Sequence, residues 1–232
     1  MSAKLGVTMM PIVSKVYCSA SEVVLAVRRR PNVANGGGFV VADYCQRVVF
    51  SVDGCGVLGR KEELILRDGE GMLCFSSGER YTDFRSYNHK GPPINYYIQT
   101  FAYVGAIIEA LSITRQWKGF TYFIGSHKLV FTLKEPNYSC FSRNIPIRIS
   151  IESKECCTYG DFDVRGDFPG RSCSIVSSKG DIVAQIGVKK EIERVMASRD
   201  LYHVEIKAGM DQAFVFGVIA VLDYIYDGTT RC

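Results

Sequence analysis

The feature that most constrains the fold is an uninterrupted apolar run near the C-terminus. Residues 213–222 read AFVFGVIAVL, with Asp211 placed to cap a helix before the run and Asp223 directly after it. At helical spacing the apolar side chains cover every face, so such a helix must be enclosed by protein or by lipid. Ten residues fall well short of the roughly 20 that a helix needs to cross a bilayer. We therefore expect a helix that protein encloses on all sides.

The rest of the chain reads as short β-strands. Apolar or alternating runs rich in Val, Ile, Phe and Tyr are separated by Gly, Asn, Asp and Ser, which is typical of strands and tight turns. Ile147, Ile149 and Ile151 alternate with polar residues, which indicates an antiparallel sheet with one buried face. We predict twelve strands, at residues 23–28, 38–42, 46–52, 62–66, 72–76, 120–124, 127–133, 146–152, 161–165, 172–177, 181–187 and 201–206.

The helix and the strands together favour one architecture. Each strand has an apolar face to bury, and the helix is apolar all round. Wrapping the sheet around the helix buries both and removes open sheet edges. We predict a mostly β protein, in which a closed or nearly closed barrel of about twelve antiparallel strands surrounds a central C-terminal hydrophobic helix. The alternative is a helix packed on one side of a β-sandwich.

The N-terminus and the cysteines bear on the cellular compartment. The first residues, MSAKLGVTMMPIVSKVYC, lack the long apolar run and cleavage site of a secretory signal, so we predict a cytoplasmic protein. The nine cysteines are an odd number without Cys-x-x-Cys spacing, and the three histidines are far apart in the sequence, so we predict no metal site. We interpret the cysteines as small hydrophobic residues in a reducing compartment.

Motifs for catalysis and cofactor binding are weak. The segment 54–59, GCGVLG, fits the G-x-G-x-x-G pattern, but the sequence after it reads as a strand, whereas a dinucleotide site needs a helix there. No G-x-S-x-G motif accompanies the scattered histidines. Asp161 and Asp163 share a face of one predicted strand, a spacing that exposed polar faces also produce. We therefore predict no enzyme activity, no catalytic residues and no cofactor.

Basic clusters are the strongest candidates for a binding site. The chain carries 28 Lys and Arg against 24 Asp and Glu, and this net charge of +4 falls short of the strongly basic surface of a dedicated nucleic-acid binder, so we predict no direct binding of nucleic acid. Arg28, Arg29 and Arg30 close the first strand, and Lys189 and Lys190 follow the eleventh. These five residues are candidates for holding a phosphorylated lipid headgroup, with Arg165, Arg171 and Lys179 nearby in the sequence. The alternative is ordinary solvated loop charge.

Several segments resemble the plant LURP-one-related family. The longest is 163–226, from DVRGDFPGRSCSIV to the apolar run, and it is similar to the C-terminal half of that family. Residues 22–54, 65–73 (ILRDGEGML) and 112–120 (SITRQWKGF) resemble other parts of it. The resemblance implies a tubby-like barrel of twelve strands around a central helix. It also implies kinship to phospholipid scramblases and to tubby-type membrane-tethered transcription factors, and a link to plant defence.

One segment departs from the family pattern. About 35 residues, at about 74–110, separate the DGEG turn from SITRQWKGF, where the family has only a few. We predict a single LURP-one-related domain over residues 1–232 with an insert at about 74–110. The simpler interpretation is that this insert is a surface loop or a hairpin extension. The other hypothesis is that it is read through from sequence that is normally removed before translation.

The favoured function is a non-enzymatic tubby-like module that binds an anionic membrane phospholipid, such as a phosphoinositide, in plant defence signalling. We expect such a protein in the cytoplasm, peripherally at the plasma membrane, or in the nucleus. The alternative is a protein-interaction or transcription-associated scaffold without lipid affinity, whose protein partners the sequence does not identify.

Overall fold

The central helix forms where the sequence predicts it. The computed structural model describes residues 7–30, 37–54, 64–76, 103–105, 116–123, 126–134, 146–152, 161–187 and 200–227. Helix α2 spans Gln212–Leu222, and its N-cap Asp211 accepts a hydrogen bond from the Phe214 amide. A π-helical turn, η4 (Asp223–Asp227), continues it. Every residue from 213 to 222 is buried, so the apolar run meets protein on all its faces.

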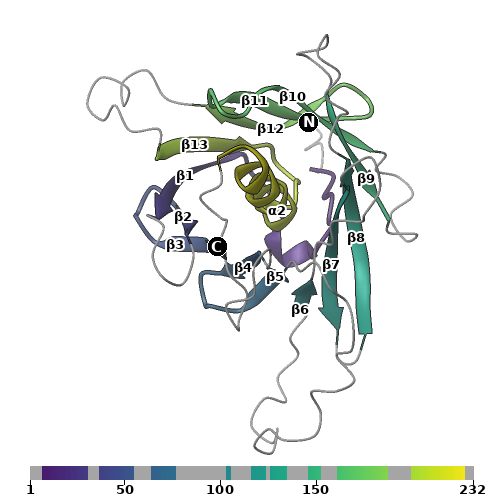
Figure 1. Cartoon of the computed structure of the whole chain (residues 1–232), viewed down its shortest axis with the longest axis horizontal. Helices are drawn as coiled ribbons and strands as arrows, with labels where there is room; N and C mark the ends of the chain where they lie inside the picture. The colour runs from purple at the N-terminus through teal and green to yellow at the C-terminus, as the bar shows by residue number, and fades with distance from the viewer. Residues whose placement is uncertain are drawn as a thin grey trace, which may run out of the picture.

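The strands form one antiparallel sheet around this helix (Figure 1). Within the described residues they are β1 (Val23–Arg30), β2 (Gly38–Ala42), β3 (Val48–Asp53), β4 (Ile65–Asp68), β5 (Leu73–Ser76), β6 (Tyr103–Gly105), β7 (Gln116–Phe123), β8 (Ser126–Lys134), β9 (Ile147–Ile151), β10 (Phe162–Asp167), β11 (Ser172–Ser177), β12 (Ile182–Gly187) and β13 (Leu201–Ile206).

The order of the strands closes the sheet into a barrel. Neighbours run β5-β4-β3-β2-β1-β13-β12-β11-β10-β9-β8-β7-β6, so β1 and β13, far apart in the sequence, lie side by side. The ring is completed between β5 and β7 by the pairing of Ser76 with Phe120. Closure leaves the apolar faces of the strands pointing inward, where the helix fills the interior.

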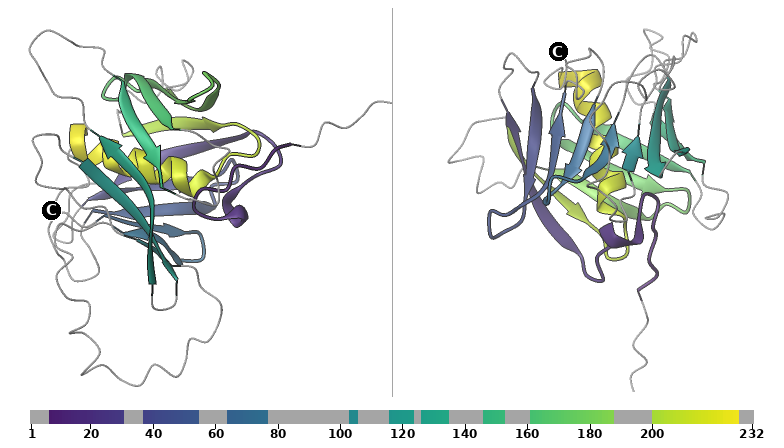
Figure 2. Two further views of the ribbon diagram at one scale, coloured as in Figure 1. Left: turned by 90° about the vertical axis from the view of Figure 1, so that its right-hand side faces the viewer. Right: turned by 90° about the horizontal axis from the view of Figure 1, so that it is seen from below.

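Aromatic contacts show that strands on opposite sides of the barrel contact the helix. Phe216 packs against Phe50 of β3, with ring centroids 5.4 Å apart. Phe214 packs against Phe131 of β8 at 5.5 Å and against Phe162 of β10 at 5.2 Å. Figure 2 shows the helix running lengthwise between the strands. The helix is therefore central, and the sandwich alternative is excluded.

An N-terminal strap, residues 9–18, covers the end of the barrel where the helix begins (Figure 2). Asp211 Oδ2 accepts hydrogen bonds from the amides of Ile12, Val13 and Ser14 at 3.0, 2.7 and 2.9 Å. The strap contains a short 3₁₀ helix, η1 (Lys15–Tyr17). One buried carboxylate thus caps the helix and holds the strap, although the two segments are about 200 residues apart in the sequence.

The predicted fold class is confirmed, and the differences are local. All twelve predicted strands are present, with β4 shifted a few residues toward the C-terminus. The additional strand β6 lies within the segment 74–110, most of which falls outside the described residues. The interpretation of that segment as an insert stays a prediction, as does the single domain over residues 1–232.

Candidate anion-binding surface

The candidate surface lies on the outer wall of β1 to β4, and strand alternation decides which arginines reach it. Along β1, Leu25 and Val27 are buried and point inward, so Arg28 and Arg30 point outward. The register places Arg28 opposite Val40 of β2, Val40 opposite Ser51 of β3, and Ser51 opposite Arg67 of β4. Three guanidinium groups therefore face solvent from the first and the last of four neighbouring strands, Arg28 and Arg30 from β1 and Arg67 from β4.

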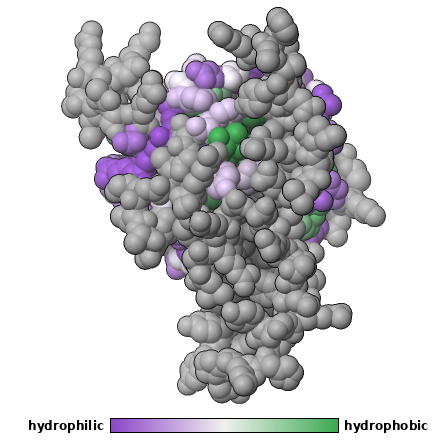
Figure 3. Space-filling view, viewed as in Figure 1, coloured by the Kyte–Doolittle hydropathy of each residue, from purple (hydrophilic) through white to green (hydrophobic). Residues whose placement is uncertain are grey.

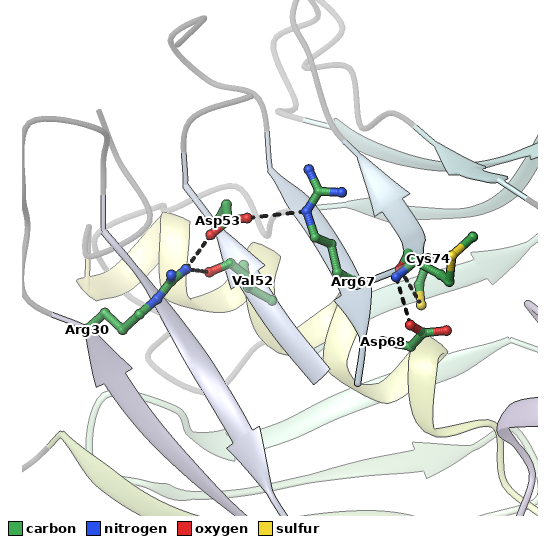
Figure 4. Close-up of polar contacts among 7 residues, drawn as sticks. Arg30, Val52, Asp53, Arg67, Asp68 and Cys74 are labelled. Carbon is green, nitrogen blue, oxygen red and sulfur yellow. Dashed lines mark hydrogen bonds and ion pairs between the residues drawn. The ribbon is translucent and has the colours of Figure 1, made fainter. Parts of the chain in front are cut away.

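Asp53 sits between two of these arginines (Figure 4). Its carboxylate accepts a hydrogen bond from Arg30 and lies 3.6 Å from Arg67 Nε. Arg30 also donates to the carbonyl of Val52. The side chains of Arg30, Asp53 and Arg67 are 41%, 35% and 32% exposed, so they remain open to solvent although they contact one another. Among the described residues that point outward from β1 to β4, three arginines, Arg28, Arg30 and Arg67, thus accompany one carboxylate, Asp53, an excess of positive charge.

Gly38 makes room for this arrangement. It lies on β2 between Arg30 and Asp53, with which it pairs across the strands, and its φ of +150° is one that other residues rarely adopt. A Cβ atom there would lie 2.0 Å from the Val52 carbonyl oxygen and 2.9 Å from Arg30 Nη2. A side chain at this position would therefore displace the group that Arg30 binds.

Arg29 points the other way and has a different role. Its Nε and Nη2 donate to Asp223 Oδ1 at 3.1 and 2.7 Å, and its Nη1 lies 3.9 Å from Asp200. The Arg29 and Asp223 side chains are 9% and 0% exposed. This pair joins β1 to the C-terminal end of the helix. A positive charge there also interacts favourably with the helix dipole. The three consecutive arginines thus do not act as one cluster.

The other predicted basic residues are scattered or lie outside the description. Lys189 and Lys190 are outside the described residues. Lys179 is exposed in the β11–β12 turn, at the end of the barrel where the helix begins. Arg171 is buried, with its guanidinium stacked 4.7 Å from the ring centre of Phe168 and 4.4 Å from that of Tyr202. The structure therefore brings Arg28 and Arg30 together and adds Arg67, a residue that the sequence analysis did not single out.

The opposite wall carries charges of both signs. Arg148 of β9 and Arg165 of β10 are 68% and 58% exposed, and both lie near Asp163, at 3.9 and 3.1 Å. Asp161 is exposed just before β10. Asp163 is engaged in these ion pairs and Asp161 is exposed. The two carboxylates, which the sequence predicted to share a face, therefore belong to an exposed charged surface. Arg148 and Arg165 serve below as matched controls for Arg28 and Arg30.

Comparison with known proteins supports the family resemblance that the sequence motifs indicate. The sequence model of the LURP-one-related family matches residues 23–223. The chain belongs to the LURP-one-related family. The match begins with the first residue of β1 and ends at Asp223, directly after the central helix, so the family's sequence pattern spans the whole barrel and its helix.

Individual members of the LURP-one-related family match over nearly the full chain. Protein LURP-one-related 6 from Arabidopsis thaliana is 48% identical over 97% of this chain and 100% of its own length. Protein LURP-one-related 16 from the same plant is 39% identical over 100% of both chains, and Protein LURP-one-related 12 is 28% identical over 92% of this chain and 83% of its own. No solved structure matches the chain.

This LURP-one-related protein also has a partly buried polar cluster that the sequence did not reveal. Cys74 Sγ donates to the Tyr17 hydroxyl at 3.0 Å, and that hydroxyl donates to Asp68 at 3.3 Å. Burial raises the pKa of Cys74 to about 12 and, as the largest of several causes, also raises that of Tyr17. The thiol and the phenol are therefore neutral at physiological pH, and the cluster offers no nucleophile.

Two further observations concern the described residues of this LURP-one-related protein. Their His, Cys, Asp and Glu side chains nowhere gather in groups of three that could hold a metal ion. Among the helices that the structure describes, none is both long and apolar enough to cross a membrane.

Proposed function

We propose that this protein is a non-enzymatic tubby-like module that binds anionic phospholipid, with phosphoinositides as the favoured ligands, through the outer wall of β1 to β4. The observation that carries the proposal is the excess of guanidinium groups there: among the described residues that point outward, Arg28, Arg30 and Arg67 face solvent and Asp53 is the one carboxylate. In the view of Figure 3, hydrophilic residues gather at the left edge, over β1 and β13.

The chemistry of these side chains suits phosphate. A guanidinium group presents a planar fork of donors that matches phosphate oxygens, and Arg30 is already held in place by Asp53 and the Val52 carbonyl. Each Lys or Arg near an anionic bilayer contributes about 1 kcal/mol, and salt screens this attraction over a Debye length of about 10 Å at 0.1 M. We therefore expect weak, reversible and salt-sensitive binding.

Membership of the LURP-one-related family supports a cellular location for this activity. The LURP-one-related family, through its resemblance to tubby-type and scramblase-type proteins, fits a peripheral role at the plasma membrane in defence signalling. In this proposal Lys189 and Lys190 supply a second contact with the headgroups. Arg29 is left out because its guanidinium is paired with Asp223.

The test is co-sedimentation with vesicles of phosphatidylcholine, with and without phosphatidylinositol bisphosphate, at rising salt. We expect binding to the anionic vesicles alone. The triple variant Arg28→Ala, Arg30→Ala, Arg67→Ala is expected to lower the affinity roughly 100-fold, because three contacts of about 1 kcal/mol are lost. A second variant, Lys189→Ala with Lys190→Ala, tests the other predicted contact.

The matched control is Arg148→Ala with Arg165→Ala, which removes exposed arginines from the opposite wall. Its affinity is expected to stay close to that of the unmodified protein. If the control variant lost as much affinity as the triple variant, binding would depend on overall charge and the proposed wall would be wrong. If the unmodified protein did not sediment with anionic vesicles at low salt, lipid binding would be ruled out and a scaffold role would take its place.

A further inference from the structure

Exposed apolar side chains are gathered at one end of the barrel. In the part of the chain that the structure describes, six large apolar residues are exposed, and all six lie at the end where the helix begins. They include Val16 on η1, which is 84% exposed, and Tyr44 in the β2–β3 turn, which is 89% exposed. The others are Val7, Val24, Val48 and Ile182.

The topology explains why these residues share an end. Val23, the first residue of β1, pairs with Ile206, the last residue of β13, and the helix begins six residues later. Since the sheet is antiparallel, β2 ends and β3 begins at this same end, with Tyr44 in the turn between them. Ile182 begins β12, the other neighbour of β13. Figure 2 (right) shows the strap at this end and the last turn of the helix at the other.

The strand register joins this apolar end to the arginine-bearing wall. On the outer face, Ala26 of β1 lies opposite Ala42 of β2, and Ala42 lies opposite Val48 of β3. Two residues farther from the end comes the row that holds Arg28 and Arg67. At about 3.3 Å per residue, the two rows are roughly 7 Å apart. The outer surface thus changes from apolar tips to small apolar residues and then to arginines.

The exposed tips are held firmly. Asp43 Oδ1 accepts hydrogen bonds from the amides of Cys45 and Arg47 at 2.8 and 3.0 Å, which fixes the turn around Tyr44. Tyr17, next to Val16, packs its ring 5.7 Å from that of Phe50, and Asp211 anchors the strap. Some charges at this end are paired, Arg47 with Asp43 and Lys207 with Glu22. Exposed side chains of both signs also lie there: Lys15, Glu70, Lys179 and Asp181. Because the apolar tips are already ordered, moving them out of water costs little further conformational entropy.

We infer that this corner, which comprises Val16, Tyr44, Val48 and the arginines Arg28, Arg30 and Arg67, is the edge by which the protein enters a bilayer surface. The inference rests on the proposed lipid binding and adds its orientation. A bilayer presents phosphates near water and apolar chains deeper, in the same order as this corner presents arginines and then apolar tips. A tyrosine combines an apolar ring with a polar hydroxyl, which suits the boundary between the two.

Tryptophan substitution tests this orientation, because the chain has a single tryptophan, Trp117, which is only 3% exposed. Tyr44→Trp and Val16→Trp are each mixed with vesicles of phosphatidylcholine and phosphatidylinositol bisphosphate, with and without brominated acyl chains. We expect a blue shift of emission and quenching by the brominated lipid in both variants. The control is Gln185→Trp, on the exposed outer face of β12, whose emission is expected to stay unchanged.

A second measurement gives the contribution of the apolar tips to the affinity for vesicles. Tyr44→Ser with Val16→Ser is expected to weaken vesicle binding roughly tenfold, because two apolar side chains no longer leave water, while the melting temperature stays the same. Sedimentation without any shift at Tyr44→Trp and Val16→Trp would overturn the orientation and leave the lipid binding standing. Absence of sedimentation would overturn both. A blue shift that grows with protein concentration in the absence of lipid would instead assign this corner to self-association.

Discussion

Neighbouring arginines on β1 have different roles because successive side chains on a strand point to opposite faces. Arg28 reaches solvent, while Arg29 turns into the barrel and meets the buried Asp223. A run of three identical residues conceals this alternation when the sequence is read as a charge cluster. At the scale of the residue, the local backbone decides whether a guanidinium serves binding or stability.

The two neighbours are therefore expected to respond differently to the same substitution. Arg29→Met removes the guanidinium that pairs with a fully buried carboxylate, and losses of this kind cost about 3–5 kcal/mol. Arg28→Met changes an exposed side chain and is expected to leave the unfolding midpoint unchanged. Urea denaturation followed by circular dichroism measures both. Equal midpoints for the two variants would contradict the assigned role of Arg29.

Cys74 gives the stability a dependence on alkaline pH. Burial raises its pKa from 9.0 to about 12, so between these values the unfolded chain releases the thiol proton while the folded protein keeps it. The folded state then binds more protons, and its stability, full below pH 9, declines as pH rises toward 12, by up to a few kcal/mol from this thiol. Urea midpoints at pH 8, 9.5 and 11 measure the decline.

Comparison with Cys74→Ala isolates this effect. Tyr17, whose pKa is also raised, and Cys173, whose pKa is raised to about 12 by burial, contribute declines of the same sign. The substituted protein is expected to be less stable at pH 8 and to lose stability less steeply above pH 9. An identical slope for both proteins would show that the Cys74 thiol ionises equally in the two states.

Among the elements, helix α2 dominates the core because strands on several sides of the barrel pack against it. Ala220 is 1% exposed, so Ala220→Asp places an unpaired carboxylate in an apolar interior. We expect a loss of several kcal/mol, enough to unfold a domain of ordinary stability. Gln212→Asp, at the partly exposed first position of the helix, is the control and is expected to fold normally.

Differential scanning calorimetry and circular dichroism check this prediction. An unchanged melting temperature for Ala220→Asp would mean that the helix can leave the barrel without loss of the native structure, and its central role would then be wrong. A melting temperature lowered equally by Gln212→Asp would show that acidic residues disturb the helix for reasons other than burial.

Periodicity predicted the elements well because it reports directly on burial. The apolar run specified the helix almost to the residue, and alternation located twelve strands. Strand β6 was missed because three residues in a segment without a period carry no such signal. Asp211 was predicted to cap the helix, but its bonds to the strap join residues nearly 200 positions apart, and no local pattern records such a contact. The inward direction of Arg29 follows from alternation with Leu25 and Val27, a signal that the sequence did contain.

At the scale of the whole molecule, the barrel has unequal seams. Among the residues that the structure describes, six pairs join β1 to β13, whereas a single pair, Ser76 and Phe120, joins β5 to β7. Few pairings mean few shared hydrogen bonds, so local opening is expected there first. Hydrogen–deuterium exchange measured by mass spectrometry should show faster exchange in peptides covering β5 than in those covering β13. Equal protection of the two strands would contradict an opening at this seam.

The position of the helix in the chain also has a consequence for biosynthesis. The residues that fill the barrel come after all the strands, and β13, the partner of β1, comes just before them. While the ribosome is still working, the emerging strands have neither their last neighbour nor anything to pack their apolar faces against. Cooperative folding must therefore wait until synthesis has passed residue 222. Until then the nascent chain exposes apolar surfaces of the kind that chaperones recognise. A truncated message that ends before the helix would encode strands without the helix that fills their barrel.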